Sequence, residues 1–326
     1  MRTTSHVLGF AAGVVIAATG GGVFTASQSR PVAPIASGPV NIDAVPVPLN
    51  PRNPAEMAVG DFRYAGGLVL TSRETNQLHG LSDLEVTGTG RLTAVGDLGI
   101  FLDARLVLDS AGWLVGLADV RLTPLTGEDS QPLSEKADAD AEGLALLPNG
   151  DRLVSFERRG RIWVYAAAGG PPRPVPMPGV AMPPNGGMEA LAVDPEAGTD
   201  AYVVGAEISG ETWTCHLLST PCVEGPSVEK PEEYGLVAIK RLPKKQTAYL
   251  LRAFDQARGS RISLQILRSG TVVGRMDLAA PMTVDNYEGL AAVPGTDGGV
   301  RFYLISDDND RADQRTLLLA FDWRPR

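Results

Sequence analysis

The segment Asp140-Ala-Glu-Gly-Leu-Ala-Leu-Leu-Pro-Asn-Gly recurs along the chain, and this recurrence determines the predicted architecture. Asn286-Tyr-Glu-Gly-Leu-Ala-Ala-Val-Pro-Gly and Gly187-Met-Glu-Ala-Leu-Ala-Val-Asp-Pro are close copies, and looser copies begin at Gly80 and Tyr234. Successive copies start roughly 45 to 60 residues apart, which is the length range of a four-stranded propeller blade. Short apolar runs alternate with Gly, Pro, Asn and Asp turns, as expected of many short strands. The repeat therefore predicts an all-β propeller.

Each copy continues into a turn and a second apolar strand. In the copy at Asp140 the turn is Pro148-Asn-Gly-Asp, and the second strand, Arg152-Leu-Val-Ser-Phe-Glu157, ends in an acid. The second strands of three other copies also end in acids, at Asp97, Glu207 and Asp307. In the copy at Tyr234 the corresponding strand is Ala248-Tyr-Leu-Leu-Arg-Ala-Phe, and Asp255 lies just beyond it.

This pattern places one acid where a hairpin begins and another where it ends, so both lie at its open end. The pairs are Glu142 with Glu157, Glu189 with Glu207, and Glu288 with Asp307. The first strand of each propeller blade lines the central channel. We therefore expect these carboxylates to converge on one mouth of the channel and to form an acidic funnel.

The number of copies predicts five blades. Six remain an alternative, because residues 105–138 and 262–284 could supply further strands. The strand-like segment Asp61-Phe-Arg-Tyr-Ala-Gly-Gly-Leu-Val-Leu precedes the first copy. We expect it to complete the last blade from the other end of the chain, which would close the ring and remove a sheet edge.

Composition narrows the classes of function. The 326 residues are 44% hydrophobic and carry a net charge of −9, with 37 Gly and 25 Pro. An acidic chain without a Lys/Arg-rich tract is not a polybasic nucleic-acid binder. No phosphate-cradling or dinucleotide-binding glycine motif is present, which argues against a nucleotide cofactor. We expect a monomer that acts on a small molecule.

The N-terminus has the pattern of a secretory signal peptide. Arg2 precedes an uncharged, mostly apolar stretch, Val7–Phe24, and small and polar residues follow. We therefore predict a signal peptide over residues 1–27, with export to the periplasm, the cell envelope or the medium. A retained membrane anchor is the alternative, and no other transmembrane domain is expected. Residues 28–59 are interpreted as a Pro/Ala-rich linker or extended arm, and residues 60–326 as the propeller domain.

Export would give the two cysteines a structural role. Cys215 and Cys222 could form a disulfide bond in an oxidising compartment, and two free buried thiols are the alternative.

The repeats resemble the bacterial phytase-like family, described as having "esterase-like activity of phytase". The resemblance covers about residues 60 to 326, and it rests on Gly80-Leu-Ser-Asp-Leu with Gly96-Asp97, Asp140-Ala-Glu-Gly-Leu-Ala with Ser155-Phe-Glu157, Gly187-Met-Glu-Ala-Leu-Ala, and Asn286-Tyr-Glu-Gly-Leu-Ala followed by Ser306-Asp-Asp-Asn and Gln314-Arg315-Thr316. It implies a β-propeller in an exported protein and hydrolysis of an ester or phosphoester. The copy at Tyr234 departs from the family pattern, since Tyr234 stands where other copies have Glu. This leaves open whether its blade supplies a ligand.

Metal-dependent chemistry suits the acids better than serine catalysis does. Converging carboxylates repel one another, and a hard cation such as Ca²⁺, which takes oxygen ligands, would relieve that repulsion. The candidate ligands are Asp97, Glu142, Glu157, Glu189, Glu207, Glu288 and Asp307, of which Glu142, Glu157 and Glu288 are the candidate catalytic residues. Alternatively, the acids only fix the blades by pairing with arginines, namely Arg158, Arg252, Arg311 or Arg315.

Two further residues are candidates for substrate binding. Arg158 follows Glu157 directly and could reach the channel mouth. Ser82 occupies the repeat position that other copies give to Glu, and a nucleophilic pair of Ser82 with His79 is conceivable, although residues three apart in an extended segment do not reliably meet. The chain has no Gly-x-Ser-x-Gly motif.

These observations favour an exported propeller hydrolase that cleaves an ester or phosphoester with carboxylates and a divalent cation, with Ca²⁺ as the expected ion. The first alternative is a non-catalytic propeller that binds a ligand or partner and uses a metal for structure. The second alternative is a metal-dependent lactonase.

Overall fold

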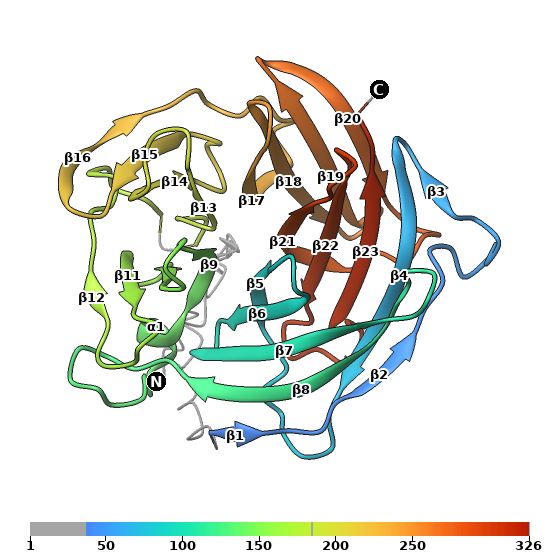
Figure 1. The fold of residues 1–326 in the computed structure, drawn as a ribbon, viewed down its shortest axis with the longest axis horizontal. Coiled ribbons are helices and arrows are strands. Elements are labelled where there is room, and N and C mark those ends of the chain that lie inside the picture. The colour runs from blue at the N-terminus through green and yellow to red at the C-terminus, as the bar shows by residue number, and fades with distance from the viewer. Residues whose placement is uncertain (1–36, 184, 326) are drawn as a thin grey trace, which may run out of the picture.

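The computed structural model describes residues 37–183 and 185–325, which form five antiparallel sheets arranged in a ring (Figure 1). The predicted signal peptide, residues 1–27, lies outside the described residues. Among residues 37–183 and 185–325, no helix has both the length and the apolar character that crossing a membrane requires.

Each sheet is one blade, and consecutive strands run from the inside of the ring outward. Blade 1 consists of β5 (Leu81–Val86), β6 (Arg91–Gly96), β7 (Ile100–Leu108) and β8 (Leu114–Pro124). Blade 2 consists of β9 (Ala141–Leu146), β10 (Arg152–Phe156), β11 (Arg161–Tyr165) and β12 (Arg173–Pro174), and the short helix α1 (Lys136–Ala139) precedes it. Blade 3 consists of β13 (Ala190–Val193), β14 (Ala201–Gly205), β15 (Thr212–His216) and β16 (Ser219–Glu224).

Blade 4 consists of β17 (Gly235–Leu242), β18 (Gln246–Asp255), β19 (Gly259–Arg268) and β20 (Thr271–Leu278). Blade 5 consists of β21 (Asn286–Pro294), β22 (Val300–Asp307), β23 (Leu317–Trp323) and β4 (Phe62–Thr71). The two segments that could have supplied strands of a sixth blade belong to blades 1 and 4. Residues 105–138 include β8, and residues 262–284 include β20. The prediction of five blades is therefore confirmed.

The ring is closed by the N-terminal strand β4, as predicted. β4 pairs with β23 of the last blade, with Val69 opposite Leu317 and Phe62 opposite Trp323. The preceding segment is an extended arm with three short strands, β1 (Gly38–Pro39), β2 (Asp43–Pro46) and β3 (Ala58–Val59). β1 pairs with β8 of blade 1, whereas β2 and β3 pair with β4 of blade 5. The arm thus spans the junction where the first and last blades meet.

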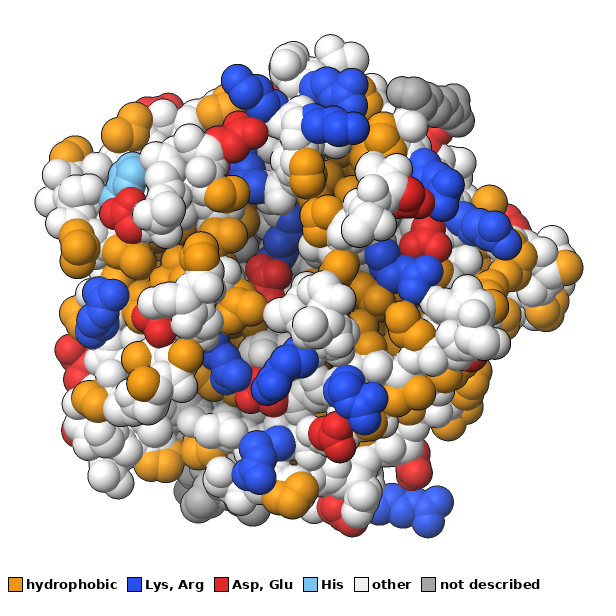
Figure 2. Space-filling model, in the orientation of Figure 1, with side chains coloured by type: hydrophobic (Ala, Val, Ile, Leu, Met, Phe, Trp, Pro, Cys, Tyr) orange, Lys and Arg blue, Asp and Glu red, His pale blue; other side chains and the backbone are white. Residues whose placement is uncertain are grey.

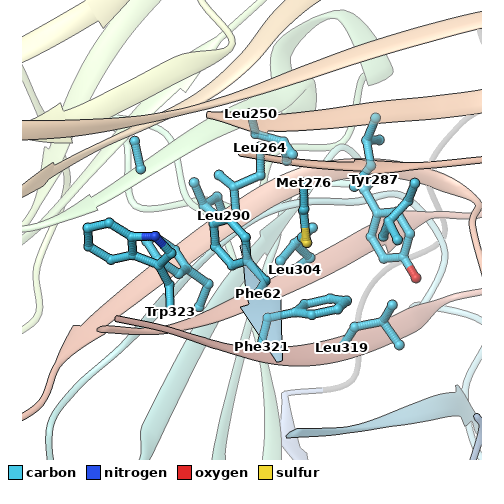
Figure 3. Close-up of a cluster of buried hydrophobic side chains, with 14 of the residues drawn as sticks. Phe62, Leu250, Leu264, Met276, Tyr287, Leu290, Leu304, Leu319, Phe321 and Trp323 are labelled. Carbon is cyan, nitrogen blue, oxygen red and sulfur yellow. The ribbon is translucent and has the colours of Figure 1, made fainter. Parts of the chain in front are cut away.

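The blades pack face to face through apolar side chains, which explains why several strands are apolar on both faces. The largest cluster lies between blades 4 and 5 (Figure 3). In it, Phe62 of β4 packs against Phe302 of β22, and Trp323 is 1% exposed. Trp323 therefore belongs to the inter-blade core.

The predicted disulfide is present, and it joins Cys215 of β15 to Cys222 of β16. It crosslinks the two outer strands of blade 3. Cys215 is fully buried, so its role is structural.

A buried ionic cluster connects the inner strands of the ring. The Asp83 carboxylate, on β5, accepts hydrogen bonds from the backbone N–H groups of Leu144 (2.9 Å) and Leu290 (3.1 Å), on the inner strands of blades 2 and 5. Lys240, on the inner strand of blade 4, lies 3.4 Å from Asp83 and 2.8 Å from Glu85. Four inner strands are therefore tied together on the axis. One face of the ring is hollowed near its centre, with acidic and basic side chains in the hollow (Figure 2).

Closure of the ring by β4 predicts the effect of a cavity in that strand. Leu68 is fully buried and pairs with Leu318 of β23. Leu68→Ala should lower the free energy of unfolding by about 2–5 kcal/mol, because the neighbouring residues cannot fill the cavity that the leucine side chain leaves. Urea denaturation would measure the loss. Val272→Ala, at an exposed position of β20, is the control, and equal stability of both variants would contradict the role assigned to β4.

Candidate active-site cavity

The open ends of the blade hairpins surround a cavity of about 940 Å³. All the acids proposed as metal ligands line it, namely Asp97, Glu142, Glu157, Glu189, Glu207, Glu288 and Asp307. They come from blades 1, 2, 3 and 5. The structure thus brings together residues that the sequence spreads over more than half of its length.

β-Bulges aim two of these acids into the cavity. In blade 2, Ala141 pairs with Phe156 and Gly143 pairs with Ser155, so Glu142 between them has no ladder partner. Glu288 occupies the same place in blade 5, between Tyr287 and Gly289. An unpaired residue at a bulge turns its side chain away from the regular alternation of the strand. The bulge explains how one motif directs a carboxylate toward the axis.

The glycine of the Glu-Gly-Leu-Ala motif is explained by the approach of the neighbouring blade. A Cβ atom at Gly143 would lie 2.5 Å from the carbonyl oxygen of Glu189, on the blade 3 side. A Cβ atom at Gly289 would lie 2.7 Å from the Cα atom of Asp83, in blade 1. In this motif the glutamate points into the cavity, and the glycine leaves room for the neighbouring blade to approach closely.

Blade 4 departs from this pattern, and the strand register shows where. Leu236 pairs with Leu251 and Ala238 with Leu250, so the bulge residue of this blade is Val237. The alignment of Tyr234 with the repeat glutamate was therefore wrong, because it did not allow for the register of the bulge. The residue that follows Leu251 is Arg252, at the position held by Asp97, Glu157 and Asp307 in blades 1, 2 and 5. Asp255 does not replace them, since it pairs with Arg258 and Arg261 instead.

Arg252 connects acids of the two neighbouring blades. Its guanidinium contacts the Glu288 carboxylate and lies 2.9 Å from Glu207 and 4.0 Å from Glu189. It also donates a hydrogen bond to the Asn286 side chain at 3.0 Å. Only 18% of the Arg252 side chain is exposed, so these ion pairs are largely shielded from solvent.

A second basic group faces blades 1 and 2. Lys136, on α1, contacts both Asp97 and Asp140, and Arg158 lies 2.7 Å from Asp140. Arg158 and Arg252 are among the arginines predicted to pair with the acids, whereas the roles of Lys136 and Asp140 were not predicted. The other two of these arginines have partners elsewhere, because Arg311 pairs with Asp313 and Arg315 with Asp285.

Three carboxylates form a group with the geometry of a cation site. Oxygen atoms of Asp140, Glu142 and Glu157 all lie within 4.8 Å of one another. Glu157 also accepts hydrogen bonds from the backbone N–H groups of Gly186 and Gly187. Within residues 37–183 and 185–325, Glu142 and Glu157 have no basic partner in an ion pair. A set of oxygen ligands with uncompensated charge suits a hard cation such as Ca²⁺ or Mg²⁺.

Burial and mutual repulsion raise the pKa values of these carboxyls. Burial raises the pKa of Glu142 well above its ordinary value, and the charges of Glu288 and Glu189 raise it further. Burial also raises the pKa of Glu189 and Glu288, and the nearby Arg252 partly opposes this increase. Burial and the charge of Glu288 raise the pKa of Asp307 to about 8.

The structure does not support the substrate-binding role expected of Ser82. Its side chain is 2% exposed and donates a hydrogen bond to the Gly80 carbonyl, and it is not among the residues that line the cavity. His79 does not pair with it, because the imidazole lies 2.7 Å from the Asp308 carboxylate. Arg158, the other substrate-binding candidate, does line the cavity.

The raised pKa values predict how stability depends on pH. At pH values between about 4 and 8 the folded protein holds protons that the unfolded chain has lost, so unfolding becomes easier as the pH rises. In the presence of a chelator, the free energy of unfolding should therefore fall from pH 4 to pH 8. Asp307→Asn should reduce this slope, as measured by urea denaturation at a series of pH values.

Asp310→Asn is the matched control, because Asp310 lies in the turn that follows Asp307 and is 76% exposed. A slope that Asp307→Asn and Asp310→Asn leave equally unchanged would contradict the assignment.

Comparison with solved structures finds distant likenesses. Virginiamycin B lyase from Staphylococcus aureus is 10% identical (86% of this chain and 99% of that chain covered, TM-score 0.45). A putative gluconolactonase is 13% identical (92% and 94% covered, TM-score 0.46), and glutaminyl cyclase from Myxococcus xanthus is 14% identical (91% and 99% covered, TM-score 0.42). Likenesses this distant carry no information about activity. A search of curated protein sequences finds no match.

A protein-family model also matches the sequence. The phytase-like family, described as "esterase-like activity of phytase", matches residues 76–310. These residues include Asp140, the seven acids predicted as metal ligands and the inner strands of all five blades. Because the match spans well over half of the sequence, the chain belongs to the phytase-like family.

Proposed function

We propose that the protein is a hydrolase that cleaves an ester or phosphoester in this cavity with the help of one divalent cation. The observation that carries the proposal is the convergence of Asp140, Glu142 and Glu157 in a cavity large enough for a small molecule. Membership of a family described by esterase-like activity supports the same class of reaction.

The donor set fits a hard cation. Asp140, Glu142 and Glu157 offer carboxylate oxygens only, which suit hard cations, and we propose Ca²⁺ as the ion. When bound, the ion would polarise the carbonyl or phosphoryl oxygen of the substrate. Glu157 is held in place for this role by the backbone N–H groups of Gly186 and Gly187.

The remaining groups of the cavity supply proton transfer and binding. Burial raises the pKa of Glu288, and the hydrogen bonds that it accepts from Arg252 and Asn286 partly oppose this increase. A carboxylate with a raised pKa that is still stabilised by these donors is suited to take a proton from an attacking water. Arg158 lies at the cavity with 43% of its side chain exposed, where it can contact a negatively charged or carbonyl oxygen of the substrate.

We also propose that the protein works outside the cytoplasm. The apolar segment Val7–Phe24 after Arg2 supports export. The disulfide between Cys215 and Cys222 supports it independently, because such bonds persist mainly in oxidising compartments.

The proposal predicts that activity depends on both the ion and the carboxylates. Hydrolysis of 4-nitrophenyl acetate or 4-nitrophenyl phosphate should be lost on chelation and recover with Ca²⁺. Glu142→Gln and Glu157→Gln should each lower kcat/KM by about 100-fold or more, because they remove a ligand, and Glu288→Gln by about 100-fold, because it removes a proton acceptor. Initial rates with purified protein measure all of these effects.

Glu135→Gln is the control, because Glu135 is 65% exposed and pairs with Arg159 away from the cavity. Chelation that lowers thermal stability without any turnover would point to a non-catalytic binding propeller. Opening of a sugar lactone without cleavage of either nitrophenyl ester would replace the proposal by a lactonase.

A further inference from the structure

We propose that Arg252 is a built-in counter-cation that restricts the cavity to a single divalent-cation site. This inference rests on the proposed function for the identity of that site, but its own evidence is the position and the contacts of Arg252. Blade 4 carries Arg252 where blades 1, 2 and 5 carry Asp97, Glu157 and Asp307. Blade 4 thus has a positive charge at a position where these other blades have a negative one.

The contacts of Arg252 resemble those of a bound cation. Carboxylates from both neighbouring blades surround its guanidinium, with Glu207 and Glu189 from the blade 3 side and Glu288 from blade 5. The Asn286 side-chain oxygen adds a further contact at 3.0 Å. The Glu189, Glu207 and Glu288 side chains are 12%, 17% and 13% exposed, so each charge needs a partner within the protein.

The basic groups divide the cavity into two parts. Arg252 partly compensates Glu189, Glu207 and Glu288, since one positive charge faces three carboxylates. Lys136 and Arg158 compensate Asp97 and Asp140. Glu142, Glu157 and Asp307 have no basic ion-pair partner among the described residues. Of these three, Glu142 and Glu157 belong with Asp140 to a group of carboxylates whose oxygen atoms are close enough to share one cation, and Asp307 does not. We therefore place the mobile cation next to Asp140, Glu142 and Glu157.

A covalently attached cation differs from a metal ion in one useful respect. Arginine keeps its charge at any physiological pH and cannot dissociate, so it joins blades 3, 4 and 5 at any concentration of free metal. Without the guanidinium, Glu189, Glu207 and Glu288 would form a second group of oxygen ligands in need of a cation. Arg252 thereby limits the cavity to one bound divalent cation.

Calorimetric titration with Ca²⁺ tests this role. Arg252→Met should bind one more Ca²⁺ ion per chain than the wild-type protein does. Arg252→Lys keeps the charge and should match the wild type. Arg258→Met is the control for loss of a cavity arginine, because Arg258 pairs with Asp255 and Glu233 rather than with these acids.

Because Arg252→Met leaves buried acids unpaired, its stability is measured in parallel. Its melting temperature should rise with added Ca²⁺ by more than that of the wild type. Equal stoichiometry and equal thermal response of the two proteins would overturn the inference. One ion bound by Arg252→Met and none by the wild type would support Arg252 as the counter-cation and contradict the proposed function. No ion bound by either protein would contradict both.

Discussion

Mutual repulsion among carboxylates gathered in one cavity is the constraint on which the rest of this molecule depends. Buried like charges are unfavourable unless protons, basic groups or metal ions compensate them. Lys136, Arg158 and Arg252 compensate part of the charge. Burial, together with the charge of Glu288, raises the pKa values of Glu142 and Asp307. A divalent cation beside Asp140, Glu142 and Glu157 would compensate a further part of the charge.

The inner strands of the blades hold these carboxylates in place. Each inner strand approaches the axis, where the Asp83 carboxylate and Lys240 tie four of them together. Bulges at Glu142 and Glu288 then turn carboxylates into the space at the strand ends. The closing strand β4 keeps the ring intact, so residues distant in sequence stay in contact. Fold stability and the geometry of the cavity therefore depend on the same inner strands.

The sequence was sufficient to predict the blades, their closure and the acids of the cavity. These features follow from periodic spacing, because the two ends of a hairpin meet whatever the details of its register. The sequence was not sufficient to predict where the side chains of Arg252, Lys136 and Ser82 lie relative to the cavity. Arg252 aligns with the acids of the other blades only if the alignment includes the bulge at Val237, which the sequence does not reveal. Lys136 lies on a four-residue helix outside the repeat. Ser82 matches the repeat glutamate in sequence, yet its side chain is buried outside the cavity.

The most direct test of the account is an anomalous difference map from crystals grown with Mn²⁺. Manganese also prefers oxygen ligands and gives a strong anomalous signal, so it would mark the cation position. The account predicts a single peak between the carboxylates of Asp140, Glu142 and Glu157. A map without a peak in the cavity, or with the peak beside Glu207 and an Arg252 side chain displaced from it, would contradict the account.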